Sequence, residues 1–278
     1  MGSDFSYDPV TAIDETTATG QTEIFADIRR TMEIPLVTSI WRGLAGMGDS
    51  LGKVWALAKP VYASGLPAPA LARIVANVGL PHPEPLVPAQ LACVGVGNRD
   101  LDDIRAILAA YNRSNGLNLV ALAALITPPA SEEAAPAPSS AVSTWPPLRP
   151  LPARDQIGDD TWEMIRHVNR FGAPGIEAGV ATLWRHLAPW PGLLALVHSA
   201  YAPFQAQGAI AAASARLVSS ALDEGARMAR LRAAEVEISR QARDTVTGYV
   251  TSPTQVARMV AMGHALESWL GVVSRRGQ

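Results

Sequence analysis

A polar hexapeptide, Tyr111-Asn112-Arg113-Ser114-Asn115-Gly116, interrupts an apolar stretch that otherwise runs from Ile104 to Ile126. A buried asparagine amide can hold a water molecule, because it offers both hydrogen-bond donors and an acceptor. Asn115 is therefore a candidate for orienting water in a hydrolytic reaction. The alternative is structural: the Asn115 side chain would bond to the backbone at a kink near Gly116.

A hydrolytic site also needs a group that takes a proton from water. Glu177 follows the loop residues Pro174 and Gly175, while His186 and His264 fall in segments expected to border the same site. A carboxylate between apolar walls has a raised pKa, and a neutral histidine needs little tuning to act as a base near pH 7. The alternatives are a helix N-terminal charge for Glu177 and a core or surface position for His264.

The sequence lacks the residue patterns of metal sites, of thiol chemistry and of phosphate-binding loops. The five histidines form no pair spaced for a metal on one helix, and the single cysteine, Cys93, allows neither a disulfide nor a thiolate pair. The segment 95–97 lacks the third glycine and the lysine of phosphate-binding loops. We therefore expect no metal and no cofactor, and a buried, unreactive Cys93.

Charge and hydropathy limit the partners. Lys and Arg number 23 against 25 Asp and Glu, which gives a formal net charge of -2 without any basic run. This balance predicts a small-molecule substrate or ligand and no nucleic acid. The longest apolar run, 119–126, is far shorter than the roughly 20 residues of a membrane helix, and residues 1–20 lack the order of a signal peptide. We expect a soluble, cytoplasmic protein without a membrane partner, and a homodimer is a reasonable assembly.

The chain contains an internal repeat. Trp41-Arg42-Gly43-Leu44-Ala45 returns as Trp184-Arg185-His186-Leu187-Ala188, and Leu51, Val54 and Pro60 meet Leu194, Val197 and Pro203 at the same offset. Such a duplication predicts two related halves packed about a pseudo-twofold axis, as in a symmetric dimer. The groove between the halves is where both sets of side chains converge, so we expect the functional site there.

The repeat also duplicates a charged pair, Arg42 and Arg185. One of the two could bind a substrate carboxylate through a two-pronged contact. Alternatively both are structural and pair with nearby carboxylates or helix ends, which repetition in both halves favours. The tryptophans Trp41, Trp184 and Trp190 are expected in the core between the halves.

Apolar residues recur at intervals of three and four, so the expected fold is all-α. Residues 127–158 are rich in Pro, Ala and Ser and predict a linker, which Trp145 would anchor to the surface. The expected organisation is a flexible tail over 1–20, a first helical repeat over 21–126, this linker, and a second helical repeat over 159–278. Helices are predicted over 22–32, 39–57, 68–78, 87–95, 100–126, 159–170, 180–188, 191–201, 206–244 and 253–273.

Three motifs together resemble the group I (DL-type) 2-haloacid dehalogenases at low identity over most of the chain. They are Met32-Glu33-Ile34-Pro35-Leu36-Val37 with the following Arg42-Gly43-Leu44-Ala45, the hexapeptide 111–116, and Leu187-Ala188-Pro189-Trp190-Pro191. The resemblance implies a helical protein of two related halves around a central site. It also implies that water attacks the halogen-bearing carbon directly, on either enantiomer, with an aspartate as the base and an asparagine holding the water.

Carried over by position, the resemblance matches the water-holding asparagine to Asn115. The position of the catalytic aspartate falls at Leu183, beside Thr182, and the aromatic pair of the substrate pocket falls at Leu36 and Ser39. A tyrosine from the last helix falls near Gly263 and His264. The resemblance therefore implies a divergent member that lacks the catalytic aspartate.

The leading hypothesis is a hydrolase that adds water at the activated carbon of a small 2-substituted (2-halo) carboxylic acid. Asn115 would orient the water, the hydroxyls of Ser39 and Thr182 would face it from the two halves, and Glu177 or a histidine would accept the proton. Tyr111, Leu36, Leu183, Arg42 and Arg185 complete the expected substrate-binding set. The alternative is a non-catalytic protein of the same fold that binds a small ligand or a partner. A polar groove floor, with Asn115 and one titratable group within about 3 Å of a common water, favours the enzyme. A floor lined only by Leu36, Ile40, Leu183 and Trp184 favours the binding protein.

Overall fold

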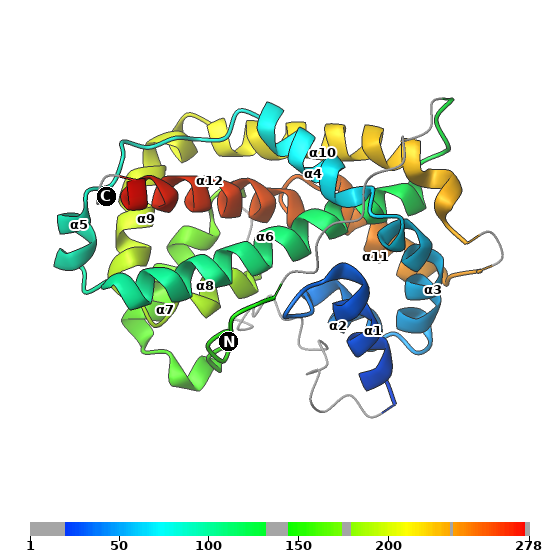
Figure 1. Ribbon diagram of the computed structural model, residues 1–278, viewed down its shortest axis with the longest axis horizontal. Coiled ribbons are helices and arrows are strands. Elements are labelled where there is room, and N and C mark those ends of the chain that lie inside the picture. The colour runs from blue at the N-terminus through cyan, green and yellow to red at the C-terminus, as the bar shows by residue number, and fades with distance from the viewer. Residues whose placement is uncertain (1–19, 132–143, 174–178, 234–235, 276–278) are drawn as a thin grey trace, which may run out of the picture.

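The computed structural model describes residues 20–131, 144–173, 179–233 and 236–275, and Figure 1 shows that the regular elements of this part are helices. The all-α prediction is confirmed. The elements in chain order are α1 (Thr22–Met32), α2 (Ser39–Ala45), α3 (Ser50–Ala63), α4 (Pro67–Asn77), α5 (Pro88–Cys93), α6 (Asn98–Ile126), η1 (Arg154–Gln156), α7 (Asp159–Asn169), α8 (Thr182–His186), α9 (Pro191–Ala206), α10 (Ala209–Met228), η2 (Ala229–Leu231), α11 (Arg240–Thr251) and α12 (Val256–Arg275).

Two of the predicted helices are wrong, because each is divided in the structure. The helix expected over 39–57 breaks into α2 and α3 at a turn that contains Gly48, whose φ of 62° lies in the left-handed region. The helix expected over 206–244 ends at η2, and α11 begins only at Arg240, capped by the Ser239 hydroxyl. Most other predicted helices end within a few residues of the observed bounds, although α9 continues through Pro203 to Ala206.

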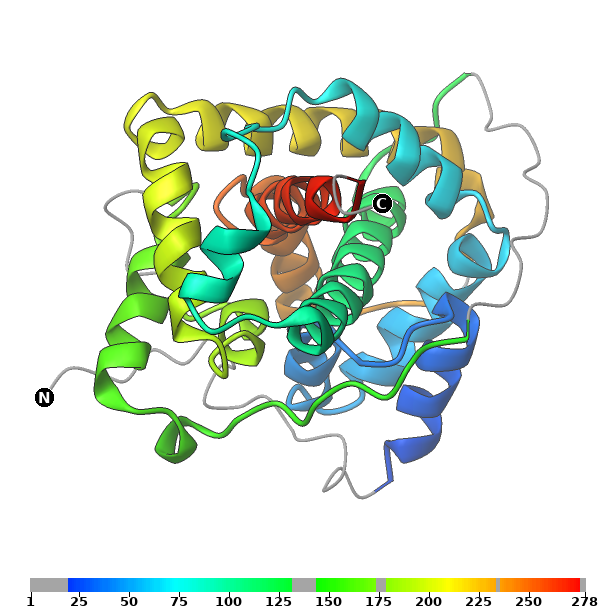
Figure 2. The ribbon, with the colours of Figure 1, turned by 60° about the vertical axis from the view of Figure 1, so that its left-hand side comes forward.

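Helices α6 and α12 lie side by side through the middle of the molecule, and the other helices form a ring around them (Figure 2). α10 packs along both central helices. Gly225 of α10 allows this approach, because a Cβ there would lie 2.6 Å from the Ala123 Cβ of α6. Gly116 plays the same part toward α4: a Cβ there would meet Leu71 at 2.4 Å, and α6 continues unbroken through this position.

The buried side chains form two hydrophobic cores, and both central helices contribute to each. The first core contains side chains of α1 to α4 and of residues 117–125 of α6. The second contains side chains of α7 to α9 and of residues 101–111 of α6. The first residues of α12 belong mainly to the first core, and residues 262–270 belong to the second. The middle of α6 and the start of α12 therefore lie where the two cores meet.

The duplicated residues occupy corresponding helices. Trp41 lies in α2 and Trp184 in α8, and both are fully buried. Pro60 and Pro203 each lie inside the next helix, α3 and α9. At each tryptophan, a short helix is thus followed by a longer helix that contains a proline.

Residues 144–153 cross the molecule from the first core to the second (Figure 2). At one end the indole Nε1 of Trp145 donates to the carbonyl oxygen of Glu33, 2.9 Å away, at the end of α1. At the other end, Arg185 of α8 donates to the carbonyl oxygen of Pro152, 2.8 Å away. Trp145 is thus an anchor of this segment, as predicted.

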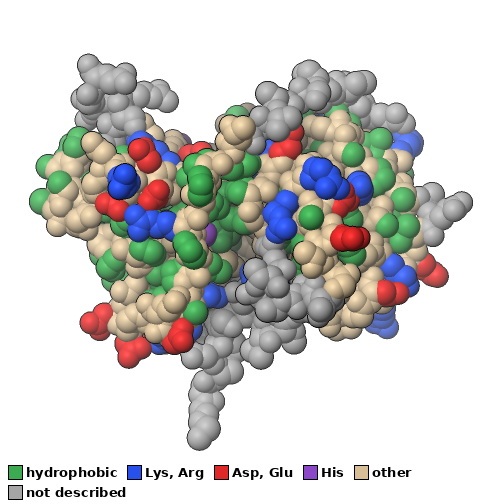
Figure 3. Space-filling view, turned by 60° about the horizontal axis from the view of Figure 1, so that its bottom comes forward, with side chains coloured by type: hydrophobic (Ala, Val, Ile, Leu, Met, Phe, Trp, Pro, Cys, Tyr) green, Lys and Arg blue, Asp and Glu red, His purple; other side chains and the backbone are tan. Residues whose placement is uncertain are grey.

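The surface shows one further difference from expectation. Cys93 is exposed at the end of α5 and is not the buried apolar residue that its neighbours suggest. Acidic and basic side chains are interspersed over the face drawn in Figure 3, with hydrophobic side chains in the hollow between its two lobes. No helix in the described part of the chain is long and apolar enough to cross a membrane.

Candidate functional site

A small cavity lies where the two cores meet. Its walls come from the start of α2, the start of α8, the middle of α6, the end of α11 and the start of α12. The residues that line it are Thr38, Ser39, Tyr111, Asn115, Ala181, Thr182, Leu183, Tyr249, Gln255, Val256 and Met259. Five of the predicted site residues, Ser39, Tyr111, Asn115, Thr182 and Leu183, therefore meet at one place.

Local contacts hold the two short helices in position at this cavity. Before α2, the Thr38 hydroxyl accepts a hydrogen bond of 2.7 Å from the Asn118 amide of α6. Before α8, the Ala181 backbone N–H donates to the Asn169 side-chain oxygen of α7 over 3.0 Å, and the Asn169 amide donates to the Gly179 carbonyl. An asparagine from a neighbouring helix thus fixes the start of each helix, so that Ser39 and Thr182 both reach the cavity.

Polar side chains predominate in the cavity lining. Seven of the eleven lining residues carry a hydroxyl or an amide, and none of the eleven is a carboxylate or a histidine. The volume is about 30 Å³, which is room for about two or three water molecules, since each needs roughly 10–15 Å³. Of the floor predicted for a binding protein, Leu183 lines the cavity and Leu36, Ile40 and Trp184 do not.

The sequence interpretation missed six of the lining residues: Thr38, Ala181, Tyr249, Gln255, Val256 and Met259. The repeat could have indicated Thr38 and Ala181, because each directly precedes a predicted site residue, Ser39 or Thr182. The other four come from α11 and α12, where no motif marks them. Their presence depends on how these helices pack against α6.

Four other predicted site residues do not line the cavity: Leu36, Arg42, Arg185 and His264. Leu36 packs against the second core. Arg185 donates to the carbonyl oxygen of Pro152 in the 144–153 segment, which is neither the carboxylate nor the helix end of the structural alternative. Glu177 lies outside the described residues.

His264 lies on α12 beside Glu267, with 3.6 Å between its Nδ1 and the carboxylate, and its Nε2 has no hydrogen-bond partner among the described residues. Burial lowers the pKa of His264 to about 4. Removal of the imidazolium from water costs more than the attraction of Glu267 returns, because the Glu267 side chain is 44% exposed and its charge is screened by solvent. His264 is therefore neutral at pH 7.

His186 is buried beside the cavity without lining it. Its Nδ1 lies 3.3 Å from the Tyr111 hydroxyl, and its Nε2 lies 2.6 Å from the Arg149 carbonyl oxygen. Burial is the main cause that lowers the pKa of His186, and the positive charge of Arg185 lowers it further. Among the histidines considered as bases, His186 is the one in contact with a lining residue.

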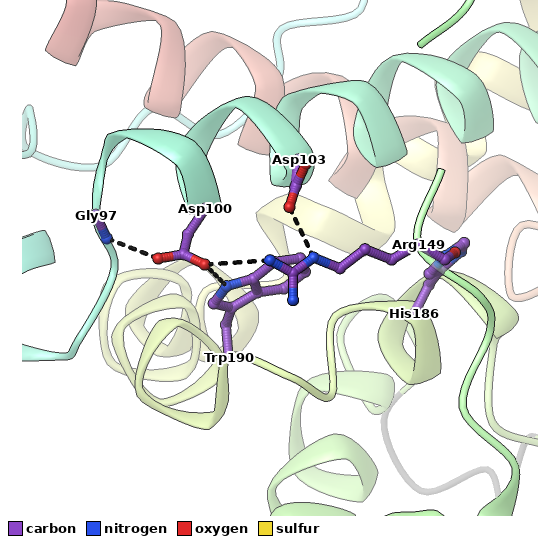
Figure 4. A network of polar contacts seen from close by, with 6 residues as sticks. All are labelled: Gly97, Asp100, Asp103, Arg149, His186 and Trp190. Carbon is purple, nitrogen blue, oxygen red and sulfur yellow. Dashed lines mark hydrogen bonds and ion pairs between the residues drawn. The ribbon is translucent and has the colours of Figure 1, made fainter. Parts of the chain in front are cut away.

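The side chain of Arg149 is held on the side of the segment away from His186 (Figure 4). Its Nε donates to Asp103 over 2.7 Å, its Nη2 lies 3.6 Å from Asp100, and its guanidinium stacks 5.0 Å from the centre of the Trp190 ring. Asp100 also accepts hydrogen bonds from the Trp190 indole and the Gly97 backbone, and these bonds lower the pKa of its carboxyl group. The backbone of Arg149 is thus fixed next to His186.

A metal site is not assembled in the part of the chain that the structure describes. No group of three or more His, Cys, Asp or Glu side chains is placed to hold an ion there. The cavity offers hydroxyl and amide groups that can hold water and a small polar ligand.

Known proteins resemble the chain in fold. No family model matches it, and no curated protein matches it in sequence. Among solved structures, a mutant D-2-haloacid dehalogenase superposes with a TM-score of 0.73 at 16% sequence identity, covering 93% of this chain and 95% of that one.

Two further D-2-haloacid dehalogenase structures match at 16% identity. A mutant in complex with D-2-CPA has a TM-score of 0.68 and covers 95% of this chain and 94% of that one. A complex with L-LA has a TM-score of 0.69 and covers 95% of each. The chain therefore has an all-helical fold that is similar, over nearly its whole length, to that of the D-2-haloacid dehalogenases.

Proposed function

We propose that the chain is a dehalogenase-like hydrolase that adds water at the activated carbon of a small 2-halo carboxylic acid. The observation that carries the proposal is the meeting of Ser39, Tyr111, Asn115 and Thr182 at one cavity. The sequence motifs single out these four residues, and they converge within a fold similar to solved D-2-haloacid dehalogenases.

In this proposal Asn115 holds the attacking water through its amide, and the hydroxyls of Ser39 and Thr182 complete the hydrogen bonds of the water and the carboxylic acid. The protein would be a divergent relative of the family, because the position matched to the catalytic aspartate is Leu183. No carboxylate lines the cavity among the described residues. Another group must therefore take the proton.

The cavity has to open for such a substrate. Its 30 Å³ accommodates water molecules but not the six heavy atoms of a 2-halopropionate. Met259 is the lining side chain best suited to move, because its unbranched chain adapts its shape at little cost. We therefore expect substrate binding to be accompanied by rotation of Met259.

The test is halide release from racemic 2-chloropropionate and 2-bromopropionate by the purified chain. Asn115→Ala should lower the rate about 100-fold or more, as loss of one oriented polar group does in other hydrolases. Asn77→Ala is the matched control, because Asn77 is exposed on α4 far from the cavity lining. Absence of release from both acids by the folded wild-type protein contradicts the proposal.

A non-catalytic small-ligand protein is the second candidate. The observation that favours it is the absence of a carboxylate among the cavity-lining residues described. Binding of a 2-haloacid without turnover, measured by calorimetry at pH 7, would distinguish it from the hydrolase.

The same proposal includes the organisation of the chain. We propose that residues 21–126 and 159–278 are related by a pseudo-twofold axis, with 127–158 as the linker between them, and that the protein works in the cytoplasm as a homodimer. The corresponding helices of Trp41 and Trp184 support the internal symmetry. Light scattering of the purified chain tests the dimer.

A further inference from the structure

The repeat places a histidine where the first half has a glycine. His186 corresponds to Gly43, so its imidazole is not part of the duplicated scaffold. It is buried in α8, and each of its ring nitrogens has one polar contact. Nδ1 contacts the Tyr111 hydroxyl, and Nε2 contacts the Arg149 carbonyl oxygen.

The contact with Arg149 determines the tautomer. A carbonyl oxygen only accepts hydrogen bonds, so the 2.6 Å contact requires a hydrogen on His186 Nε2. In the neutral imidazole Nδ1 is then an acceptor, and the Tyr111 hydroxyl, 3.3 Å away, donates to it. The rings meet edge to face, with 5.8 Å between their centres. His186 Nδ1 is thus available as a base toward Tyr111.

Tyr111 connects this base to the cavity. It lines the cavity together with Asn115, which follows one helical turn later on α6. A phenol can donate a hydrogen bond through its proton and accept another through its oxygen. Tyr111 can therefore receive a proton from cavity water while it passes its own proton to His186.

The titratable and charged residues around His186 come from three elements. Tyr111 faces it from α6, Arg185 is its neighbour on α8, and Arg149 faces it from the 144–153 segment with a carbonyl oxygen. The guanidinium of Arg149 points away, toward Asp103 and Asp100 (Figure 4), so its charge is balanced there. Burial and Arg185 hold the pKa of His186 below 6.5, which keeps the ring neutral at pH 7.

We propose that Tyr111 and His186 form a proton relay that replaces the missing aspartate, an inference that rests on the proposed function. The water oxygen forms a bond to carbon 2 of the acid, and the halide leaves with the electron pair of its carbon–halogen bond. The proton of the water passes to the Tyr111 oxygen as the Tyr111 proton passes to His186 Nδ1. The imidazolium keeps its Nε2–H bond to Arg149 and later releases the proton to solvent.

In this scheme Tyr111 is the catalytic residue that contacts water, and His186 acts through it. Arg149 is a positioning residue, because its carbonyl oxygen sets the tautomer of His186. The linker between the halves thus contributes directly to the chemistry of the cavity.

The first experiment measures the relay without requiring turnover. Protein labelled with ¹⁵N-histidine is studied by ¹H–¹⁵N correlation NMR at pH 7, with the His186 signals assigned from their loss in His186→Gln. We expect a neutral Nε2–H tautomer whose Nδ1 signal moves in Tyr111→Phe and does not move in Tyr201→Phe. Tyr201 is the matched control, because it is fully buried in the second core and its hydroxyl bonds to no described residue. The relay is overturned by an Nδ1–H tautomer, or by an Nδ1 signal that has the same position in the wild type and in Tyr111→Phe.

The second experiment measures kcat and KM for halide release. Tyr111→Phe and His186→Gln should each lower kcat at least 100-fold with little change in KM, and the double variant should be no worse than either, because the two act as one unit. Tyr201→Phe and His198→Gln should keep wild-type rates. The wild-type rate should fall as pH drops through the pKa of His186, below 6.5, and the residual rate of His186→Gln should lack this fall.

Each failure has its own signature. Wild-type activity that survives in Tyr111→Phe and His186→Gln overturns the relay and leaves the proposed function standing. Wild-type protein without halide release, whose Nδ1 signal still responds to Tyr111→Phe, overturns the proposed function and preserves the hydrogen-bonded pair. If His186→Gln does not fold by circular dichroism, His186→Asn replaces it, and Tyr111→Phe keeps the aromatic packing in any case.

Discussion

The starts of α2 and α8 have similar sequences but different polar surroundings. In α2, Trp41 Nε1 and the Tyr62 hydroxyl both donate to the Asn118 oxygen, over 3.1 and 2.8 Å, and the Asn118 amide donates to Thr38. In α8, the Trp184 Nε1 has no hydrogen-bond partner among the described residues, and the residue equivalent to Thr38 is Ala181.

The difference lies in the kinds of polar group at the two helix starts. The α2 network, made of Thr38, Trp41, Tyr62 and Asn118, contains no group that titrates near pH 7. Its polar atoms satisfy one another in the interior, and its member Thr38 also lines the cavity. Around α8 the polar contacts also connect a titratable ring, His186, to the cavity through Tyr111. A buried asparagine holds the start of each helix, Asn118 at α2 and Asn169 at α8, and the α8 side additionally has His186 next to the cavity.

Removal of Asn118 from the α2 network should lower the free energy of unfolding more than any other change considered. Asn118→Ala leaves three buried groups, on Trp41, Tyr62 and Thr38, without the partner they have in the structure. Since each such group costs about 1–3 kcal/mol, partly recovered by relaxation, we expect the free energy of unfolding to fall by about 4 kcal/mol. Urea unfolding followed by circular dichroism measures it, with Asn77→Ala as the surface control. A loss under about 1 kcal/mol would show that the network is not structural.

Acid should weaken the second half next. Among the described residues, the buried His186 and the largely buried His264 both belong to the segment 159–278, and burial lowers the pKa of each. The unfolded chain then binds protons more tightly, so stability is unaffected above about pH 6.5 and falls as the pH drops toward the folded pKa. With the pKa of His264 at about 4, this residue alone accounts for a loss of about 3 kcal/mol between pH 6.5 and 4.

The measurement is the free energy of unfolding of the wild type, His264→Gln and His82→Gln at pH 7.0, 5.5 and 4.5. His264→Gln should flatten most of the decline, whereas His82→Gln should leave it intact, because His82 is exposed. An equal decline in all three proteins would refute the assignment to His264.

Trp41 and Trp184 allow a direct comparison of the polar surroundings of α2 and α8. Trp41→Phe and Trp184→Phe remove the same volume from fully buried sites. Trp41→Phe also loses a hydrogen bond, whereas Trp184→Phe removes a buried N–H that has no partner in the described structure. We expect Trp41→Phe to be the more destabilising by about 1–2 kcal/mol in urea unfolding. Equal losses would mean that the indole hydrogen bond contributes nothing.

The smallest effect should come from the glycine that His186 replaces. Gly43 lies in α2, and a Cβ there would meet nothing within 4 Å outside its own helix turns. Gly43→Ala should therefore stabilise the protein by about 0.5–1 kcal/mol through helix propensity. Gly263→Ala is the contrasting control, because its Cβ would lie 2.0 Å from the Asn112 oxygen and must force a shift. Thermal unfolding should show a higher stability for Gly43→Ala than for the wild type, and a lower stability for Gly263→Ala.

The candidate site can be predicted from the sequence where a motif or the repeat marks it. Asn115 stands in the polar hexapeptide, and Ser39 and Thr182 are equivalent positions of the repeat, so a pattern points to each of the three. Tyr249 and Gln255 have no such mark, because they reach the cavity only through the packing of α11 and α12. His264 is marked by its residue type and by the family resemblance, but it does not line the cavity.

Local sequence patterns are sufficient for the helical fold and the boundaries of most helices, because these depend on the periodicity of apolar residues along the chain. The packing of the helices sets which side chains share the cavity and which ring nitrogen of His186 carries its hydrogen. It also brings the carbonyl oxygen of Arg149 to that nitrogen. Contacts such as the one between Arg149 and His186 join residues far apart in sequence. They arise when helices pack, and no local pattern records them.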